Sequence, residues 1–138
     1  MSKLVGRVRT GFGLASSSFA GFFDELSRLA GISLLPGTLN LELRSEFEFT
    51  PQGTLPRAVG NGYEDLHYHA CQLSSRDEPT IPAVPALIVR TSTQAERRSK
   101  HSLRVLEIAA PVRLREKLRR RDRSWVKVVL TAMPRSGA

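Results

Sequence analysis

Polar and apolar residues alternate along several short segments of this chain, and stretches rich in glycine, proline or polar residues separate these segments. The alternation is clearest over residues 38–43, where Leu39, Leu41 and Leu43 are each preceded by a polar residue. A period of two is typical of a strand with one buried face. The pattern predicts six short strands, over residues 3–10, 38–43, 66–73, 83–89, 103–109 and 125–130.

Two segments have the spacing of a helix instead. Over residues 19–29, apolar side chains recur every three or four positions, with Ser18 as the expected N-cap and Gly31 as the expected C-cap. A shorter helix is predicted over residues 112–120, because the preceding Pro111 suits the first turn of a helix.

The order of these elements bears on the fold class. Helices and strands do not alternate regularly, which argues against a doubly wound parallel sheet and favours a mainly β protein, a small barrel with short inserted helices. The segment 50–65 carries two prolines and three glycines and is expected to form a long loop. With 138 residues, the chain has room for one domain, which we place at residues 1–132, followed by a flexible tail at 133–138.

The composition is that of an ordinary globular protein. Hydrophobic residues make up 41% of the chain and charged residues 25%, so intrinsic disorder is not expected. No apolar run approaches the roughly 20 residues needed to cross a bilayer, and the single cysteine, Cys71, excludes an internal disulfide. We therefore expect a cytoplasmic monomer without a membrane partner.

Positive charge is the one unusual bulk property. The net charge is +8, and many of the basic residues lie in the runs 97–101 and 113–123. A basic surface attracts nucleotide phosphates and other polyanions. The two runs indicate either a solvated surface or a patch that faces phosphate groups.

Gly11 and Gly13 follow the first predicted strand and precede the first predicted helix. Glycines in this position let backbone N–H groups approach phosphate oxygens, and the helix that follows presents its positive end. The spacing matches neither a P-loop nor a dinucleotide-binding fingerprint. Phosphate binding and ordinary turn formation both remain open for this loop.

Three polar residues on predicted strands are candidates for chemistry. Thr38 and Asn40 are two positions apart, so their side chains lie on one face, and neutral oxygen ligands of this kind suit Mg²⁺. An exposed polar strand face is the alternative interpretation. Glu107 lies among apolar residues, and a buried carboxylate needs a partner, which could be an arginine or a ligand.

Other candidates carry less weight. His67 and His69 share a strand face but have no further metal ligand at a suitable spacing, and Cys71 has the position of a core residue. The basic run 113–123 lacks the interleaved aromatic residues of a nucleic-acid stacking surface. No catalytic nucleophile or base is assigned.

Three segments, in this order along the chain, resemble the archaeal-type CTP-dependent riboflavin kinases. They are the glycine loop, the Pro-Gly-Thr-Leu-Asn segment at 36–40 and the Leu-Glu-Ile-Ala-Ala-Pro-Val-Arg-Leu-Arg-Glu segment at 106–116. The resemblance spans residues 4–130. It implies a compact six-stranded cradle-loop β-barrel that transfers the γ-phosphoryl group of CTP to the 5′-hydroxyl of riboflavin, giving FMN, with Mg²⁺ as cofactor.

The resemblance also implies a role for individual residues. Thr38 and Asn40 would hold Mg²⁺, while Ser99 and Glu107 would contact the flavin. The nucleotide would lie between the glycine loop and the segment after the fifth predicted strand. The residues that would contact it are Phe12, Gly13, Leu14, Ala15, Ser16, Ser17, Val112, Arg113, Leu114 and Arg115.

Departures from the family pattern leave alternatives open. Leu14 and Ala15 stand where the family often has an acidic residue and a glycine, and the segment 122–124 reads Asp-Arg-Ser in place of Asp-Gly-Asp. A Cβ at residue 15 restricts the backbone near a phosphate. The donor could thus be CTP or ATP, and a flavin- or nucleotide-binding relative without turnover is an alternative function. A basic nucleic-acid-binding barrel is another, although no nucleic-acid partner is expected.

Overall fold

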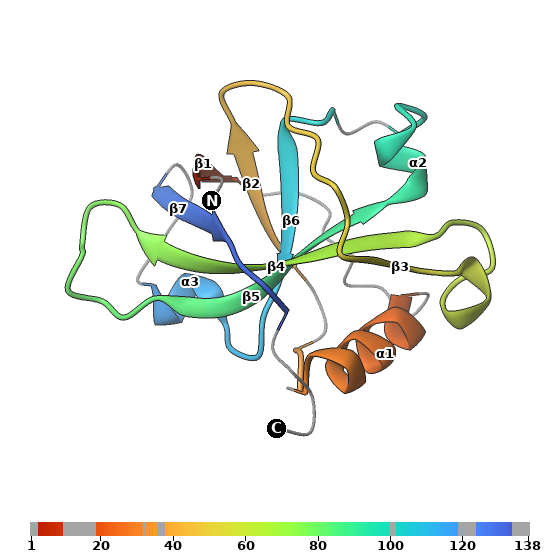
Figure 1. Ribbon diagram of the computed structural model, residues 1–138. Helices are drawn as coiled ribbons and strands as arrows, with labels where there is room; N and C mark the ends of the chain where they lie inside the picture. Colours follow the sequence, from red (N-terminus) through yellow and green to blue (C-terminus); the bar gives the residue numbers. More distant parts are fainter. Residues whose placement is uncertain are drawn as a thin grey trace.

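The computed structural model describes residues 3–9, 19–31, 33–35, 38–99, 102–118 and 124–133. Most of the regular structure in these ranges is β (Figure 1). The strands are β1 (Lys3–Arg9), β2 (Leu39–Leu43), β3 (Gly53–Leu55), β4 (Leu66–Ser75), β5 (Val84–Thr91), β6 (Val105–Ala109) and β7 (Trp125–Leu130). The helices are α1 (Ala20–Ala30), the 3₁₀ helix η2 (Arg57–Val59), α2 (Ser92–Ala95) and α3 (Leu114–Lys117).

Six of the strands close into a barrel. They pair antiparallel in the order β4–β5–β6–β2–β1–β7, and β7 pairs again with the second half of β4. The short strand β3 lies outside this ring, because it pairs only with the first residues of β4. The expected small six-stranded barrel is therefore confirmed, and β3 is an addition within the segment predicted to be a loop.

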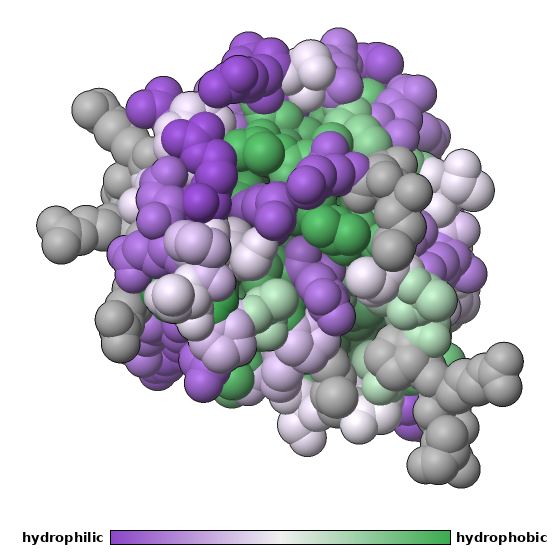
Figure 2. All heavy atoms as spheres, turned by 60° about the vertical axis from the view of Figure 1, so that its left-hand side comes forward, coloured by the Kyte–Doolittle hydropathy of each residue, from purple (hydrophilic) through white to green (hydrophobic). Residues whose placement is uncertain are grey.

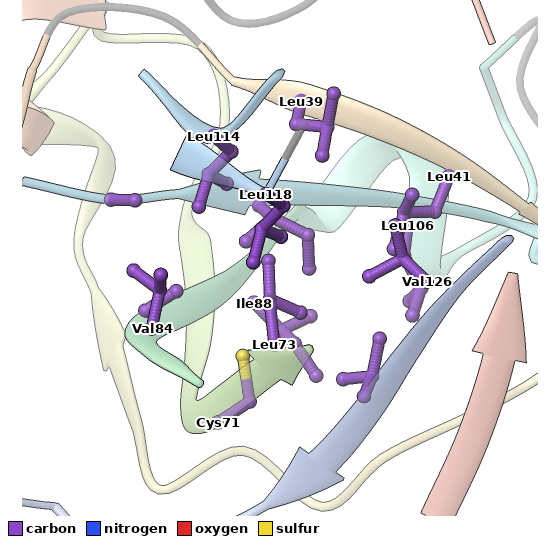
Figure 3. Packing of buried hydrophobic residues seen from close by; sticks show 14 of the residues in the cluster. Leu39, Leu41, Cys71, Leu73, Val84, Ile88, Leu106, Leu114, Leu118 and Val126 are labelled. Atoms are coloured by element: carbon purple, nitrogen blue, oxygen red, sulfur yellow. The ribbon is translucent and has the colours of Figure 1, made fainter. Parts of the chain in front are cut away.

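The barrel interior is filled by one face of each strand (Figure 3). Leu41, Leu73, Ile88 and Leu106 belong to this core and are at most 1% exposed. Cys71 lies among them, which confirms its interpretation as a core residue, and burial raises the pKa of its thiol to about 12. Strand alternation thus directs every second side chain of the barrel strands to the outer surface.

Part of that outer surface is covered by α1. Phe22, Phe23 and Leu26 of the helix pack against a second core that includes Leu87 and Val89 of β5. The helix also approaches η2 closely at Gly21, where a Cβ atom would lie 2.1 Å from a backbone oxygen of η2. Only glycine permits this approach, so the position of α1 depends on it.

The helix boundaries differ from the sequence expectations. α1 begins at Ala20 with Phe19 as its N-cap, so the assignment of the cap to Ser18 was wrong, whereas Gly31 is confirmed as the left-handed C-cap with φ of 69°. α3 begins only at Leu114, because Arg113 has an extended backbone. No helix in the described ranges is long and apolar enough to span a membrane.

Candidate active site

Asn40 of β2 and Glu107 of β6 lie directly opposite each other in neighbouring strands. The residues on either side of each belong to the barrel interior, so the side chains of Asn40 and Glu107 are directed to the outer surface. Directly opposed residues have Cβ atoms about 5 Å apart. Both residues are only 4% exposed, although an outward-facing polar side chain is usually solvated.

Thr38 completes the group. Its hydroxyl donates a hydrogen bond to Glu107 Oε1 at 3.3 Å, across 69 residues of sequence. The structure thus confirms that Glu107 is buried and has a partner. It also brings the two residues expected to bind metal next to a residue expected to bind flavin. We call these three residues the Thr38–Asn40–Glu107 cluster.

The chemistry of the cluster fits a hard cation. Asn40 Oδ1 is buried and has no hydrogen-bond partner in the described part of the chain, which costs about 1–3 kcal/mol when nothing else satisfies it. The Thr38 hydroxyl donates its proton to Glu107, and its oxygen is a neutral ligand of the kind that Mg²⁺ accepts. Two neutral oxygen ligands with a carboxylate close to them are an arrangement that suits Mg²⁺.

Arg9 is a neighbour of this cluster that the sequence analysis missed. It is the last residue of β1, pairs in register with Asn40, and its Nη1 lies 3.2 Å from Glu42 Oε2. The alternation of Arg7 and Arg9 along the first strand was the available signal, since it places both on the polar face. A guanidinium beside the cluster adds positive charge where a phosphate-bearing ligand would need it.

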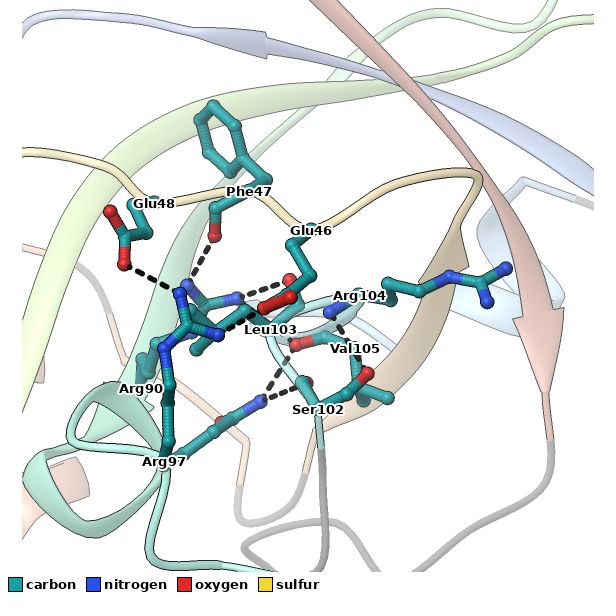
Figure 4. A network of polar contacts seen from close by, with 10 residues as sticks. Glu46, Phe47, Glu48, Arg90, Arg97, Ser102, Leu103, Arg104 and Val105 are labelled. Atoms are coloured by element: carbon teal, nitrogen blue, oxygen red, sulfur yellow. Dashed lines mark hydrogen bonds and ion pairs between the residues drawn. The ribbon is translucent and has the colours of Figure 1, made fainter.

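A buried hydrogen-bond network supports the segment that leads into β6 (Figure 4). Arg90 of β5 is 3% exposed, and its Nη2 donates to the carbonyl oxygens of Leu103 and Val105 at 3.2 Å each. Gln94 of α2 donates from Nε2 to the carbonyl oxygens of Ser102 and Val105 at 3.0 Å each. The start of the strand that carries Glu107 is therefore fixed by two other elements.

The pKa of the Arg90 guanidinium depends on its burial and on the carboxylates near it. Burial lowers the pKa of its guanidinium to about 10, and the carboxylates of Glu48 and Glu107 oppose that shift. The group therefore stays charged at neutral pH. Its charge is one of the features that stabilise Glu107 as a buried carboxylate.

The segment before Ser99 is held by ion pairs (Figure 4). The guanidinium of Arg97 contacts the carboxylates of Glu46 and Glu48, the latter at 3.3 Å. Arg97 has a φ of 61°, a left-handed conformation that is uncommon outside glycine. Ser99 lies two residues further on and is half-buried. The ion pairs thus connect the loop that carries this flavin candidate to the segment after β2.

The nucleotide candidates of the second segment follow directly after β6. Val112 is half-buried against the interior core, Arg113 is exposed, and Leu114 is 5% exposed inside that core. Leu114 can therefore offer a ligand only its backbone. Arg115 follows it in α3. The Leu35 N–H donates to the Ala110 carbonyl at 2.9 Å, which ties this segment to the chain before β2.

The glycine-loop residues expected to bind phosphate lie outside the described residues, and they are Phe12, Gly13, Leu14, Ala15, Ser16 and Ser17. The loop begins after β1, whose last residue, Arg9, pairs with Asn40. The histidines considered for a metal have other contacts: His67 Nδ1 lies 2.7 Å from Thr54 Oγ1, and His69 Nδ1 lies 2.7 Å from the Ala70 carbonyl oxygen.

Comparison with known proteins shows the family of this chain. Residues 9–130 match the model of the family CTP-dep_RFKase, described as a domain of unknown function, DUF120. A riboflavin kinase of Pyrobaculum calidifontis is 31% identical over 130 residues, which cover 91% of this chain and 58% of that protein. A riboflavin kinase of Methanococcus vannielii is 25% identical over 137 residues, covering 92% of this chain and 96% of the relative.

A riboflavin kinase of Thermofilum pendens is 26% identical over 115 residues, covering 79% of this chain. This chain spans only 49% of that protein, as it spans 58% of the Pyrobaculum protein. The chain therefore corresponds to about half the length of two relatives and to nearly the whole of the third.

Proposed function

Because this chain belongs to the family of CTP-dependent riboflavin kinases, we propose that it transfers the γ-phosphoryl group of CTP to the 5′-hydroxyl of riboflavin and releases FMN and CDP. The observation that carries the proposal is the Thr38–Asn40–Glu107 cluster. It combines an unpartnered buried oxygen, a hydroxyl and a buried carboxylate on one outer face of the barrel. Most buried oxygens are hydrogen-bonded, so this one is a candidate for contact with a ligand.

Thr38 and Asn40 are the proposed ligands of Mg²⁺. When bound there, the cation would supply positive charge that neutralises phosphate oxygens. Asn40 Oδ1 gains the interaction it otherwise lacks. Glu107 holds the Thr38 hydroxyl through the 3.3 Å hydrogen bond and so fixes the direction of the threonine oxygen.

The two nucleotide segments would position the donor. The backbone N–H groups of residues 12–17 would donate to phosphate oxygens, and the backbone of residues 112–115 would contact the base. Arg113 is exposed and can reach a ligand, while Leu114 anchors the segment in the barrel core. Such fixed donors act mainly by positioning the two reacting oxygens in line and by stabilising charge.

Glu107 and Ser99 would position riboflavin. Glu107 pairs with Val89 of β5, which belongs to the apolar core beneath α1, so the carboxylate borders an apolar surface. A flavin has an apolar ring system and a polar ribityl chain, and this border matches both parts. The carboxylate would accept a hydrogen bond from the flavin and orient it, and a loose transition state does not require a strong base.

The test is a direct assay of product formation. The purified chain is incubated with riboflavin and Mg²⁺, with either CTP or ATP, and the flavins are separated by chromatography. FMN with CTP alone is the expected result. FMN with ATP alone would overturn the nucleotide assignment and implicate the altered glycine loop at Leu14 and Ala15. Absence of FMN with both donors from a folded protein would favour a relative that binds without turnover.

The metal assignment has its own control. Asn40→Ala should abolish FMN formation while the circular dichroism spectrum is unchanged, because the substitution removes a proposed ligand and no internal hydrogen bond of Oδ1. Asn61→Ala serves as the matched variant, since Asn61 lies in the loop between η2 and β4 and should leave turnover intact. Full activity of Asn40→Ala in Mg²⁺ would contradict the assignment.

A further inference from the structure

We propose that the outer surface around Trp125 binds single-stranded nucleic acid, at a site separate from the Thr38–Asn40–Glu107 cluster. Three guanidinium groups converge on one indole ring: the Cζ atoms of Arg7, Arg44 and Arg76 lie 5.1, 5.0 and 4.7 Å from the ring centroid of Trp125. Since each lies about 5 Å from one point, no two are more than about 10 Å apart. We call these four residues the Trp125 cluster.

Most of this charge is not neutralised within the described part of the chain. Arg76 lies 3.3 Å from Asp77, but Arg7 and Arg44 contact no carboxylate among the described residues. The nearest acidic residues on β2 and just after it are engaged elsewhere: Glu42 with Arg9 and Arg104, and Glu46 with Arg97.

A guanidinium that lies over an indole is attracted to the ring by a cation–π interaction. This attraction does not use the N–H donors, so the arginine can still bind a phosphate bidentately. The ring also restricts the rotation of the long side chains, which lowers the entropy lost when an anion binds. The Trp125 cluster therefore presents several oriented phosphate donors at one place.

The positive surface extends along the strands. The register of β1 with β7 pairs Arg7 with Trp125 and Val5 with Lys127. Lys3 shares the outward face of β1 with Arg7, four residues away, a distance of about 13 Å along a strand. A row of cations longer than one phosphate group favours a linear polyanion over a single free anion.

A cleft lies beside these cations. Its volume is about 310 Å³, and Leu4, Leu43 and Phe47 line it together with Lys3, Arg44 and Arg76. Figure 2, which brings the left-hand side of Figure 1 forward, shows hydrophobic side chains in a hollow bordered by hydrophilic ones. A basic track beside an apolar hollow is an arrangement that binds the backbone and bases of a single strand. Trp125 itself holds the arginines rather than a base, because three guanidinium groups already lie over its ring.

The proposed surface is distinct from the candidate active site. Asn40 lies near the start of β2, whereas Arg44 follows the end of that strand, so about 13 Å of extended chain separates them. None of the residues of the Trp125 cluster belongs to the proposed metal, flavin or nucleotide ligands. Nucleic-acid binding can therefore be tested independently of kinase activity.

Trp125 is the only tryptophan of the chain, so its fluorescence reports directly on this surface. The full chain is titrated with 12-nucleotide oligouridylate and oligothymidylate at salt concentrations from 50 to 300 mM. We expect a saturable change in emission and a slope of log K against log salt of about −2, since each of three phosphates contributes roughly −0.7 on a single strand. The anisotropy of a labelled oligonucleotide should give the same binding curve.

Two variants locate the effect. Arg44→Ala should weaken binding about eight-fold at 50 mM salt, the factor that corresponds to the loss of one phosphate contact. Arg28→Ala removes the same charge from an exposed position on α1 and should change the affinity less than two-fold. FMN formation should be the same in Arg44→Ala as in the parent chain, because Arg44 has no part in the proposed catalytic machinery.

Three outcomes would overturn the proposal. The first is the absence of a saturable fluorescence or anisotropy change at 50 mM salt. The second is an equal loss of affinity in Arg44→Ala and Arg28→Ala, which would indicate an effect of net charge rather than of a site. The third is equal affinity for inorganic polyphosphate and for the oligonucleotides, because a surface that reads only charge would not distinguish them. All three outcomes concern binding alone, so they test this proposal even if the chain has no kinase activity.

Discussion

Replacement of Asn40 by leucine separates stability from the proposed function, and its effects can be worked out from the structure. Asn40 is 4% exposed and its Oδ1 has no hydrogen-bond partner in the described part of the protein. Burial of an unpaired oxygen costs about 1–3 kcal/mol, and leucine has a similar size without that oxygen. In the absence of metal, Asn40→Leu should therefore stabilise the fold rather than destabilise it.

The expected shift is large enough to measure. For a chain of this length, each kcal/mol changes Tm by roughly 3–4 °C, so Asn40→Leu should raise Tm by roughly 3–12 °C in EDTA. Mg²⁺ should raise the Tm of the parent chain, because a ligand that binds only the folded state stabilises it, and should leave the variant unchanged. The variant should form no FMN.

Asn61→Leu is the matched control. Asn61 Oδ1 accepts hydrogen bonds from the N–H groups of Tyr63 at 2.9 Å and Glu64 at 3.2 Å, so the same substitution removes two interactions there. Its Tm should fall in EDTA. The reasoning is refuted if Asn40→Leu has a lower Tm than the parent chain in EDTA, or if it keeps Mg²⁺-dependent FMN formation.

Three further predictions follow from single residues. The Cys71 thiol is buried and has a pKa near 12, so it should not react with a thiol reagent at pH 8 until denaturant is added. Fast stoichiometric labelling of the native chain would contradict the placement of Cys71 in the barrel core. Gly21→Ala should cost about 3 kcal/mol in urea unfolding. Gly31→Ala should cost about 1 kcal/mol, because its Cβ would meet no atom within 4 Å and only its left-handed φ of 69° disfavours alanine; equal losses would show that α1 does not depend on close contact with η2. Arg97→Ala should raise KM for riboflavin roughly two- to five-fold and leave KM for CTP unchanged, because it releases the loop that carries Ser99 from Glu46; equal changes in both would count against that role.

The barrel strands could be predicted from the sequence because their alternation is a local property. All six predicted strands are present, and the last, β7, has the predicted bounds. β3 was missed because three residues between glycine- and proline-rich neighbours show no period, and only pairing with β4 makes them a strand. The start of α3 was placed too early because Pro111 suits a helix start, while the chain stays extended until Leu114 enters the core.

The composition of the candidate site could be predicted in parts but not as a whole. Thr38, Asn40 and Glu107 were each identified from the character of their segments. Their contact depends on the register of β2 against β6, which residues 69 positions apart cannot reveal without the topology. For the same reason the sequence did not identify Arg90, which lay just beyond a predicted apolar strand and whose partners are carbonyl groups of another segment.

Arg90 and Asn40 show how a buried polar residue that builds the fold differs from one that awaits a ligand. The Nη groups of Arg90 donate to three carbonyl oxygens, and its Cζ lies 5.4 Å from the ring centroid of Phe49. Contacts within the chain therefore compensate most of the cost of removing this guanidinium from water, although its Nε has no partner among the described residues. Asn40 presents instead an unpartnered acceptor oxygen, beside a hydroxyl that already donates to Glu107. An N–H group without a partner needs an acceptor, whereas a bare carbonyl oxygen needs either a hydrogen-bond donor, such as water, or a cation. The deficit at Asn40 is therefore of the kind that the proposed Mg²⁺ would satisfy, whereas Arg90 serves the architecture that holds β6 in place.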